Sequence, residues 1–168
     1  MTSQHGIEIT VPSGELIVTK TNTEGVVTYG SRNFFALTGY SETELLGQFH
    51  QVLHHPDVPK AYYKLLVDLT TKNSHEFFGI YKALTKQGNF YWSFVHVTPS
   101  YNSRCTLLGF QSITRPAKPE LVAQFGEWYR EMRTIEQTQS ASKSAQFLFE
   151  KIAEKGMNYN EFVFSYQA

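Results

Sequence analysis

The sequence has little cysteine, no long apolar run and no excess of charge of either sign. Its single cysteine, Cys105, excludes an intrachain disulfide and fits a reducing compartment. No run of about 18 apolar residues exists, and the first residues lack the basic start of a signal peptide. We therefore expect a cytoplasmic protein without a membrane span. Fifteen basic residues balance fifteen acidic ones, which gives no electrostatic reason to expect a nucleic-acid partner.

Aromatic residues, in contrast, are abundant. The chain of 168 residues contains 13 Phe, 10 Tyr and 2 Trp. Such side chains can pack a core, line a ligand cavity or cover a partner surface. The length suggests one domain, with room for an appendage.

Local patterns predict an α+β domain. Five β-rich segments are separated by turn residues, and the last three form an antiparallel meander; the segments are 15–20, 26–29, 76–84, 90–98 and 105–114. Ser41 and Glu44 match a capping box for a short helix. The four-residue spacing of Ala61, Leu65 and Leu69 predicts a longer helix from Lys60. We expect a five-stranded antiparallel sheet with short helices and one longer helix on one face.

The composition changes after Arg115, where two prolines end the sheet pattern. Apolar residues at three- to four-residue spacing predict an amphipathic helix over 120–136. The polar stretch 137–143 is predicted to be a linker, and 145–155 a second helix that ends at Gly156. The remaining residues fit either a strand or a helix. We divide the chain into an N-terminal cap (1–14), a central domain (15–117) and a C-terminal helical extension (118–168).

The stretch HHPDVP, residues 54–59, has four possible roles. His55 and Asp57 could clamp a ligand. Asp57 could instead cap the helix that begins near Lys60, with His55 packed beneath it. His54, His55 and Asp57 are also suitable metal ligands, although adjacent residues of extended chain point to opposite sides. A histidine and an aspartate could form a general base and its orienter, but no nucleophile or phosphate-loop motif accompanies them.

Three blocks of sequence resemble a known family. The stretch SRNFFALTGYSETELLGQ (31–48) resembles the small-helix region of PAS domains, with Thr38, Gly39 and Tyr40 at its centre. GNFYWSFVHVTP (88–99) and LLGFQSITRP (107–116) resemble the fourth and fifth strands of that fold. The resemblance covers roughly residues 15–117 and implies a PAS fold.

A closer resemblance involves HPDVPKA (55–61) and FGIYK (78–82), which are similar to the PAS domains of bacterial aerotaxis receptors. Those domains hold FAD and report its redox state. The resemblance implies candidate cofactor-binding residues at His54, His55, Asp57, Ser31, Tyr63, Val67, Phe77, Ala83 and Trp92. At five of these positions the aerotaxis group has other residues, and here they are His54, Ser31, Val67, Phe77 and Ala83.

The function that follows from this resemblance is sensory. The domain would bind FAD or another small molecule between the longer helix and the sheet, and the 120–136 helix would carry the signal to a protein partner. We also expect a homodimer that forms through the sheet or the flanking helices, and, since no catalytic motif accompanies the histidines, no enzymatic activity. The alternative is a cofactor-free PAS adaptor that binds other proteins, and the many Phe side chains could then fill the cavity.

Overall fold

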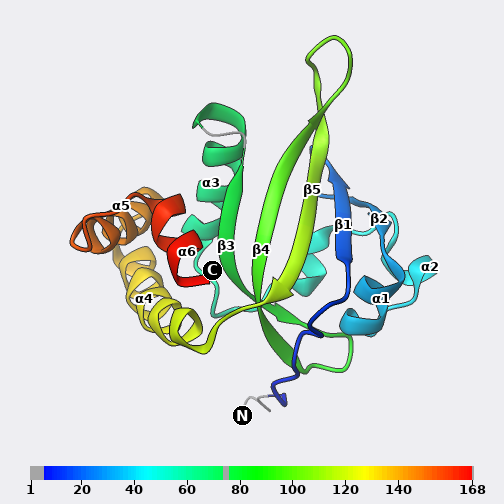
Figure 1. The fold of residues 1–168 in the computed structure, drawn as a ribbon, viewed down its shortest axis with the longest axis horizontal. Coiled ribbons are helices and arrows are strands. Elements are labelled where there is room, and N and C mark those ends of the chain that lie inside the picture. Colours follow the sequence, from blue (N-terminus) through cyan, green and yellow to red (C-terminus); the bar gives the residue numbers. More distant parts are fainter. Residues whose placement is uncertain (1–5, 74–75, 168) are drawn as a thin grey trace.

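The computed structural model describes residues 6–73 and 76–167. Its centre is a five-stranded antiparallel sheet in the order β2-β1-β5-β4-β3. The strands are β1 (Ile17–Asn22), β2 (Val27–Gly30), β3 (Phe77–Leu84), β4 (Phe90–Tyr101) and β5 (Leu107–Pro116). All five predicted strands are confirmed, and the predicted α+β architecture is confirmed with them. The long β4–β5 hairpin extends beyond the rest of the sheet (Figure 1).

Short helices connect β2 to β3. They are α1 (Arg32–Thr38), α2 (Glu42–Leu45), the 3-10 helix η1 (His50–Leu53), α3 (Lys60–Asp68) and the π-helix η2 (Leu69–Asn73). The predicted capping box is present, because the Ser41 side chain accepts from the Glu44 N–H while the Glu44 carboxylate accepts from the Ser41 N–H. Gly39 ends α1 with a φ of 75°, a left-handed conformation that glycine adopts without a steric penalty.

The two faces of the sheet have different neighbours. In β4, Tyr91, Ser93, Val95 and Val97 point to the face that carries α1 to α3, and the alternate residues point to the opposite face. The sheet therefore presents one covered inner face and one outer face.

Gly109 in β5 allows close approach to β1, since an added Cβ would lie 1.9 Å from the Thr21 carbonyl oxygen.

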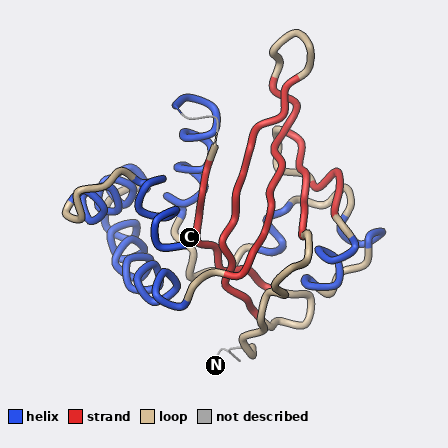
Figure 2. The backbone as a smooth tube through the Cα atoms, viewed as in Figure 1, coloured by secondary structure: helices blue, strands red, loops and turns tan. Residues whose placement is uncertain are grey.

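The C-terminal extension forms a second group of helices, α4 (Pro119–Thr138), α5 (Ala141–Ala153) and α6 (Tyr159–Gln167). The predicted linker over 137–143 is wrong, because α4 continues to Thr138 and Ser140 already caps α5. The segment near the C-terminus, which fitted either structure, is helical over Tyr159–Gln167. These helices pack beside β3 at one edge of the sheet, while α1 and α2 lie near the other edge (Figures 1 and 2).

Tyr129 joins α4 to the edge strand β3. Its buried hydroxyl donates to the carbonyl of Ile80 at 2.6 Å, and its ring stacks on Trp92. This bond satisfies a backbone group of an edge strand that would otherwise face outward without a partner. The extension thus covers a sheet edge.

The N-terminal segment pairs with the start of β4. The Ile9 N–H donates to the Phe90 carbonyl at 2.8 Å, and the Phe90 N–H donates to Ile7 at 3.1 Å. Val11 is buried. Residues 1–5 of the predicted cap 1–14 lie outside the described residues. Within the described part of the chain, no helix is both long and apolar enough to cross a bilayer.

Candidate functional site

A cavity of about 340 Å³ lies between the inner face of the sheet and the helices η1 and α3. This volume is at the lower end of the range for small-molecule sites. The cavity is lined by Thr19, Thr21, Thr23, Glu24, Gly25, Phe34, Phe49, His50, Gln51, His54, Tyr62, Tyr63, Leu66, Val67, Tyr81, Tyr91, Ser93, Val95, Val97, Phe110, Ser112 and Thr114.

The lining combines aromatic rings with hydroxyl groups. Rings come from both walls, since Tyr62 of α3 stacks on Tyr81 of β3 with 5.4 Å between centroids. Hydroxyls come from alternate positions of neighbouring strands, because Thr19 and Thr21 on β1 face the cavity together with Ser112 and Thr114 on β5. A lining of aromatic rings with a few polar groups among them suits a planar heteroaromatic ligand.

Two neutral histidines stand on the helical wall. Burial lowers the pKa of His50 to about 4. Burial, with repulsion from His50, lowers the pKa of His54 to about 3. The His54 ring stacks on Tyr63 with 4.1 Å between centroids. A neutral imidazole has one donor and one acceptor, so this pair can bind the polar edge of a ligand without adding charge.

The Tyr63 hydroxyl is available to a ligand. It is buried beside the Tyr81 hydroxyl but makes no hydrogen bond of normal geometry with any described residue. Burial raises the pKa of Tyr63, so the group is a neutral donor and acceptor. An unsatisfied buried hydroxyl is costly, and a ligand acceptor or a water in the cavity would satisfy it.

The cavity has almost no charge. Among the described residues that line it, none is Lys or Arg, and Glu24 is the acidic one. Glu24 is exposed, as are Phe49, Gln51 and Val67, and these residues surround the mouth. Charged groups of a ligand would therefore meet no cation inside the cavity.

The structure brings three of the predicted cofactor residues, His54, Tyr63 and Val67, to this cavity. The others do not line it. Ser31 is the N-cap of α1, and its hydroxyl accepts from the N–H of Val18 at 3.1 Å. Phe77 is fully buried and stacks on Tyr159 of α6.

The remaining candidates on the sheet have packing roles. Ala83 is buried in β3, and its backbone pairs with His54 in an isolated bridge. Trp92 points to the outer face, where it stacks on Tyr129 of α4. Trp92 thus touches the C-terminal extension and does not line the cavity.

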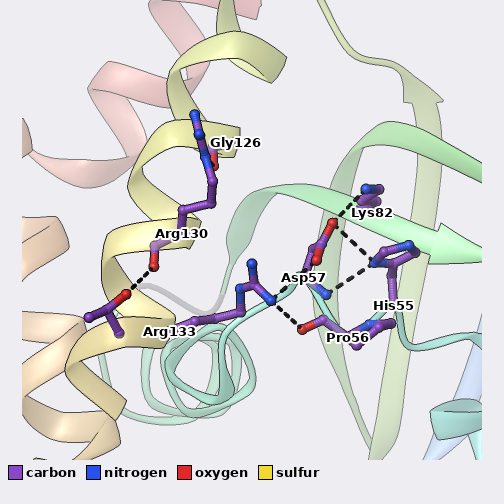
Figure 3. A network of polar contacts seen from close by, with 8 residues as sticks. His55, Pro56, Asp57, Lys82, Gly126, Arg130 and Arg133 are labelled. Atoms are coloured by element: carbon purple, nitrogen blue, oxygen red, sulfur yellow. Dashed lines mark hydrogen bonds and ion pairs between the residues drawn. The ribbon is translucent and has the colours of Figure 1, made fainter. Parts of the chain in front are cut away.

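His55 and Asp57 do not line the cavity, and both belong to a polar network with Lys82 and Arg133 (Figure 3). The Lys82 ammonium donates to Asp57 Oδ2 at 2.7 Å, and Arg133 Nη1 lies 3.2 Å from Asp57 Oδ1. Partial burial raises the pKa of the Asp57 carboxyl, but its hydrogen bond with Lys82 and the neighbouring positive charges lower it below its usual value. His55 Nδ1 accepts from the Asp57 N–H at 3.0 Å.

The interpretation of Asp57 as the cap of α3 is wrong. Pro59 occupies the N-cap position and provides no side-chain hydrogen bond. The N–H groups of Lys60 and Ala61 instead donate to the Glu136 carboxylate, at 2.9 and 2.8 Å. A residue 75 positions away in the sequence therefore caps this helix. Local sequence could not indicate this, because N-cap rules consider only neighbouring residues.

Other functional candidates were missed for different reasons. His50 and His54 are four residues apart, a spacing visible in HQVLH, and that spacing could have paired them. The alternation of Thr19 with Thr21 and of Ser112 with Thr114 could also have indicated one polar face. Among the described residues, no cluster of three or more His, Cys, Asp or Glu side chains is placed to hold a metal ion.

Comparison with known proteins identifies the class to which this architecture belongs. The family model described as PAS fold matches residues 27–114, more than half of the chain. The chain therefore belongs to the PAS fold family. This match runs from β2 through the helices to β5 and so includes most of the cavity wall.

One relative and several solved structures refine the picture. The chain is similar to the aerotaxis receptor of Escherichia coli (strain K12), with 29% identity over 114 residues. The match covers 68% of this chain but only 22% of that receptor. The fold is similar to a PAS domain from Colwellia psychrerythraea, with a TM-score of 0.56, 22% identity, and coverage of 60% of this chain and 85% of the other.

A light-oxygen-voltage domain studied with a flavin analogue is also similar in fold. It has a TM-score of 0.57 and 15% identity, and the match covers 67% of this chain and 85% of the other. The light-state structure of the blue-light photoreceptor Aureochrome1 LOV has a TM-score of 0.57 and 17% identity, with 73% of this chain and 94% of the other covered. At these identities the likeness concerns the fold.

Proposed function

We propose that this protein is a PAS sensory module that binds a flavin, or a ligand with a similar planar heteroaromatic ring, in the cavity between the sheet and α3. The observation that carries the proposal is the cavity itself, with aromatic walls, two neutral imidazoles and the buried Tyr63 hydroxyl. The similarity to an aerotaxis receptor supports the choice of a flavin. A bound flavin would supply reversible electron acceptance and hence sensitivity to redox state.

The chain's own residues would have separate roles. His50, His54 and Tyr63 would bind the polar edge of the ring, because all three present neutral hydrogen-bonding groups to the cavity. The hydroxyls of β1 and β5 would face the ring from the sheet. Ligand binding or a change of redox state would shift the population of docked positions of α4.

The part of the ligand inside the cavity is proposed to be uncharged. A buried phosphate requires cationic or N–H partners, and the lining provides no Lys or Arg among the described residues. A phosphate or diphosphate tail would therefore extend past Glu24 and Gln51 at the mouth. Riboflavin should then bind at least as tightly as FMN.

The first test is the visible absorption spectrum of protein purified without denaturation, followed by mass spectrometry of any released molecule. We expect flavin bands, or uptake of added riboflavin with quenching of its fluorescence. The Ser112→Phe variant fills the cavity, and we expect it to weaken riboflavin binding by tenfold or more. The control is Gln111→Phe, whose neighbouring position on the same strand points to the outer face.

Three outcomes would contradict parts of the proposal. Equal binding by both variants would place the ligand elsewhere. Binding of FMN at least tenfold tighter than riboflavin would contradict an uncharged cavity. Protein that is colourless and takes up no riboflavin would instead favour the cofactor-free adaptor, whose binding partner would then be sought on the outer sheet face or the C-terminal helices.

A further inference from the structure

Two side chains of α4, Arg133 and Glu136, contact residues 56–61, which lead into the first turn of α3. Arg133 and Glu136 are three residues apart and so lie on one face of the helix. Glu136 accepts from the N–H groups of Lys60 and Ala61 at 2.9 and 2.8 Å. Arg133 Nη1 lies 3.2 Å from Asp57 Oδ1 and donates to the Pro56 carbonyl at 3.5 Å (Figure 3). We call these contacts of Arg133 and Glu136 with residues 56–61 the clamp.

The same segment continues into the cavity wall on both sides of the clamp. His54, immediately before it, lines the cavity and stacks on Tyr63. The helix α3, immediately after it, contributes Tyr62, Tyr63, Leu66 and Val67 to the lining. Cavity wall and clamp are thus parts of one continuous stretch of chain, residues 54–67.

This stretch is too stiff to absorb a displacement locally. Pro56 and Pro59 have φ restricted by their rings, and the Val58 N–H donates to the His55 carbonyl at 3.0 Å in a turn. Lys82 holds Asp57 from the sheet side at 2.7 Å. A movement of His54 or of α3 should therefore reach the clamp.

Both contacts of the clamp bring opposite charges together. The first turn of α3 contains no acidic residue and Pro59 gives no cap, so the partial positive charge of this helix end is met by the Glu136 carboxylate. Arg133 faces the Asp57 carboxylate in the same way. Both contacts hold α4 to the segment, and both need α4 in its present position.

We propose that Arg133 and Glu136 are positioning residues that couple the cavity to α4, so that the docked position of α4 and the shape of the cavity wall depend on each other. The coupling deepens the proposed sensory function, since a cavity ligand would be its input. By linkage, the factor by which a ligand changes α4 docking equals the factor by which α4 release changes ligand affinity. In this view the signal leaves the cavity through residues 54–61.

Hydrogen exchange on the full chain tests the clamp without any ligand. We expect Glu136→Ala and Arg133→Met to raise amide exchange by tenfold or more in the first turn of α3 and in α4, while β1 and β5 keep their protection. The matched controls are Glu131→Ala and Arg130→Met, because both residues are exposed on the same helix. Among the described residues, Arg130 donates within its own helix, to the Gly126 carbonyl (Figure 3). Exchange in the controls should equal that of the wild type.

A second measurement distinguishes coupling of α4 to the cavity from mere stabilisation of α3. The His54 ring protons lie over the Tyr63 ring and should have strongly shifted proton resonances in the wild type. We expect Glu136→Ala to move them toward unstacked values, although Glu136 does not line the cavity. Glu136→Gln, which keeps one acceptor oxygen, should restore part of the shift.

Two results would overturn the proposal. In the first, exchange in Glu136→Ala rises only at Lys60 and Ala61 and the His54 resonances stay unchanged, so that Glu136 is a local cap alone. In the second, protection falls equally over the whole chain, β1 and β5 included, so that the contacts serve general stability.

The added probe for the proposed function is riboflavin. Wild-type protein that takes up none would refute flavin binding, whereas the exchange and resonance measurements would still decide on the clamp. If riboflavin binds, an affinity equal in wild type and Glu136→Ala would overturn the coupling while leaving flavin binding intact.

Discussion

At the scale of single residues, surroundings decide what each histidine can do. His50 and His54 face a cavity whose walls exclude much of the water, so their imidazoles stay neutral in the folded state. His96 is on the outer face instead, stacked on Phe78 and 3.7 Å from Glu76. Three residues of one type thus occupy two chemically different environments, and the cavity pair is the part suited to binding an uncharged ligand edge.

The neutral pair predicts how stability depends on pH. The folded-state pKa values of His50 and His54 lie below their usual value of 6.5. Between pH 6.5 and about 4 the unfolded chain therefore binds more protons, and stability falls as the pH decreases. With allowance for partial exposure, we expect each histidine to cost about 1 kcal/mol at pH 5 relative to pH 7.

Urea denaturation at pH 7 and pH 5 measures this loss. The variants His50→Gln and His54→Gln should each show a smaller loss than the wild type. A loss in both variants equal to that of the wild type would mean that the pH dependence arises elsewhere in the chain.

At the scale of elements, helix α4 supplies a hydrogen-bond partner to the edge strand β3. In the sheet β3 lies at the edge beside β4, and its other side, apart from the bridge of Ala83 with His54, has backbone groups that need partners. The Tyr129 hydroxyl of α4 provides one at Ile80, and α6 packs against the same strand. The helices therefore supply polar as well as apolar contacts to the sheet.

Removing only this hydroxyl should have a measurable cost. Tyr129→Phe keeps the ring contacts with Trp92 and Phe125 but leaves the buried Ile80 carbonyl without its donor. We expect a loss of about 1–3 kcal/mol in the free energy of unfolding. In the control Tyr166→Phe the residue is 45% exposed, and the change should stay below about 0.5 kcal/mol. Equal effects would show that the hydroxyl bond at the sheet edge contributes little.

At the scale of the whole molecule, the extension shares the core of the domain. Its buried side chains continue the cluster formed by β3 and α3; they are Leu121, Phe125, Trp128, Tyr129, Met132, Ala145, Leu148, Ile152, Tyr159, Phe162 and Val163. The predicted boundary at 117/118 therefore separates a sheet region from a helical region, and the side chains of both regions pack into one core.

A chain that ends at Ala117 should be strongly destabilised. It would expose Phe77, Ile80 and Leu65, which are buried in the full chain and lie on the elements that the extension covers. We expect a loss of about 5 kcal/mol or more, enough to abolish cooperative unfolding in a small protein. Denaturant titration with binding of a hydrophobic dye measures this, and a peptide of residues 118–168 should restore the transition. An unchanged midpoint would make the extension a detachable module.

Much of the fold could be predicted because its signals are local. β-rich segments between turn residues marked the five strands, and the capping box at Ser41 with the spacing of Ala61 and Leu65 marked the helices. The linker over 137–143 was predicted wrongly because a polar stretch can equally be a solvated helix end. Of the candidate site residues that the resemblance implied, His54, Tyr63 and Val67 line the cavity. Tyr63 and Val67 lie on the predicted helix α3, whereas His54 follows η1.

The sequence by itself determined the strands, the short helices and the family, because these depend on neighbours within a few residues and on motifs in order. Only the tertiary structure decided that Trp92 faces α4, that His50 joins His54 in the cavity, and that Glu136 caps a helix 75 residues away. These facts depend on how distant elements pack. Hydrogen bonds and buried charges between distant segments arise only when the core brings them together, and no local pattern encodes them.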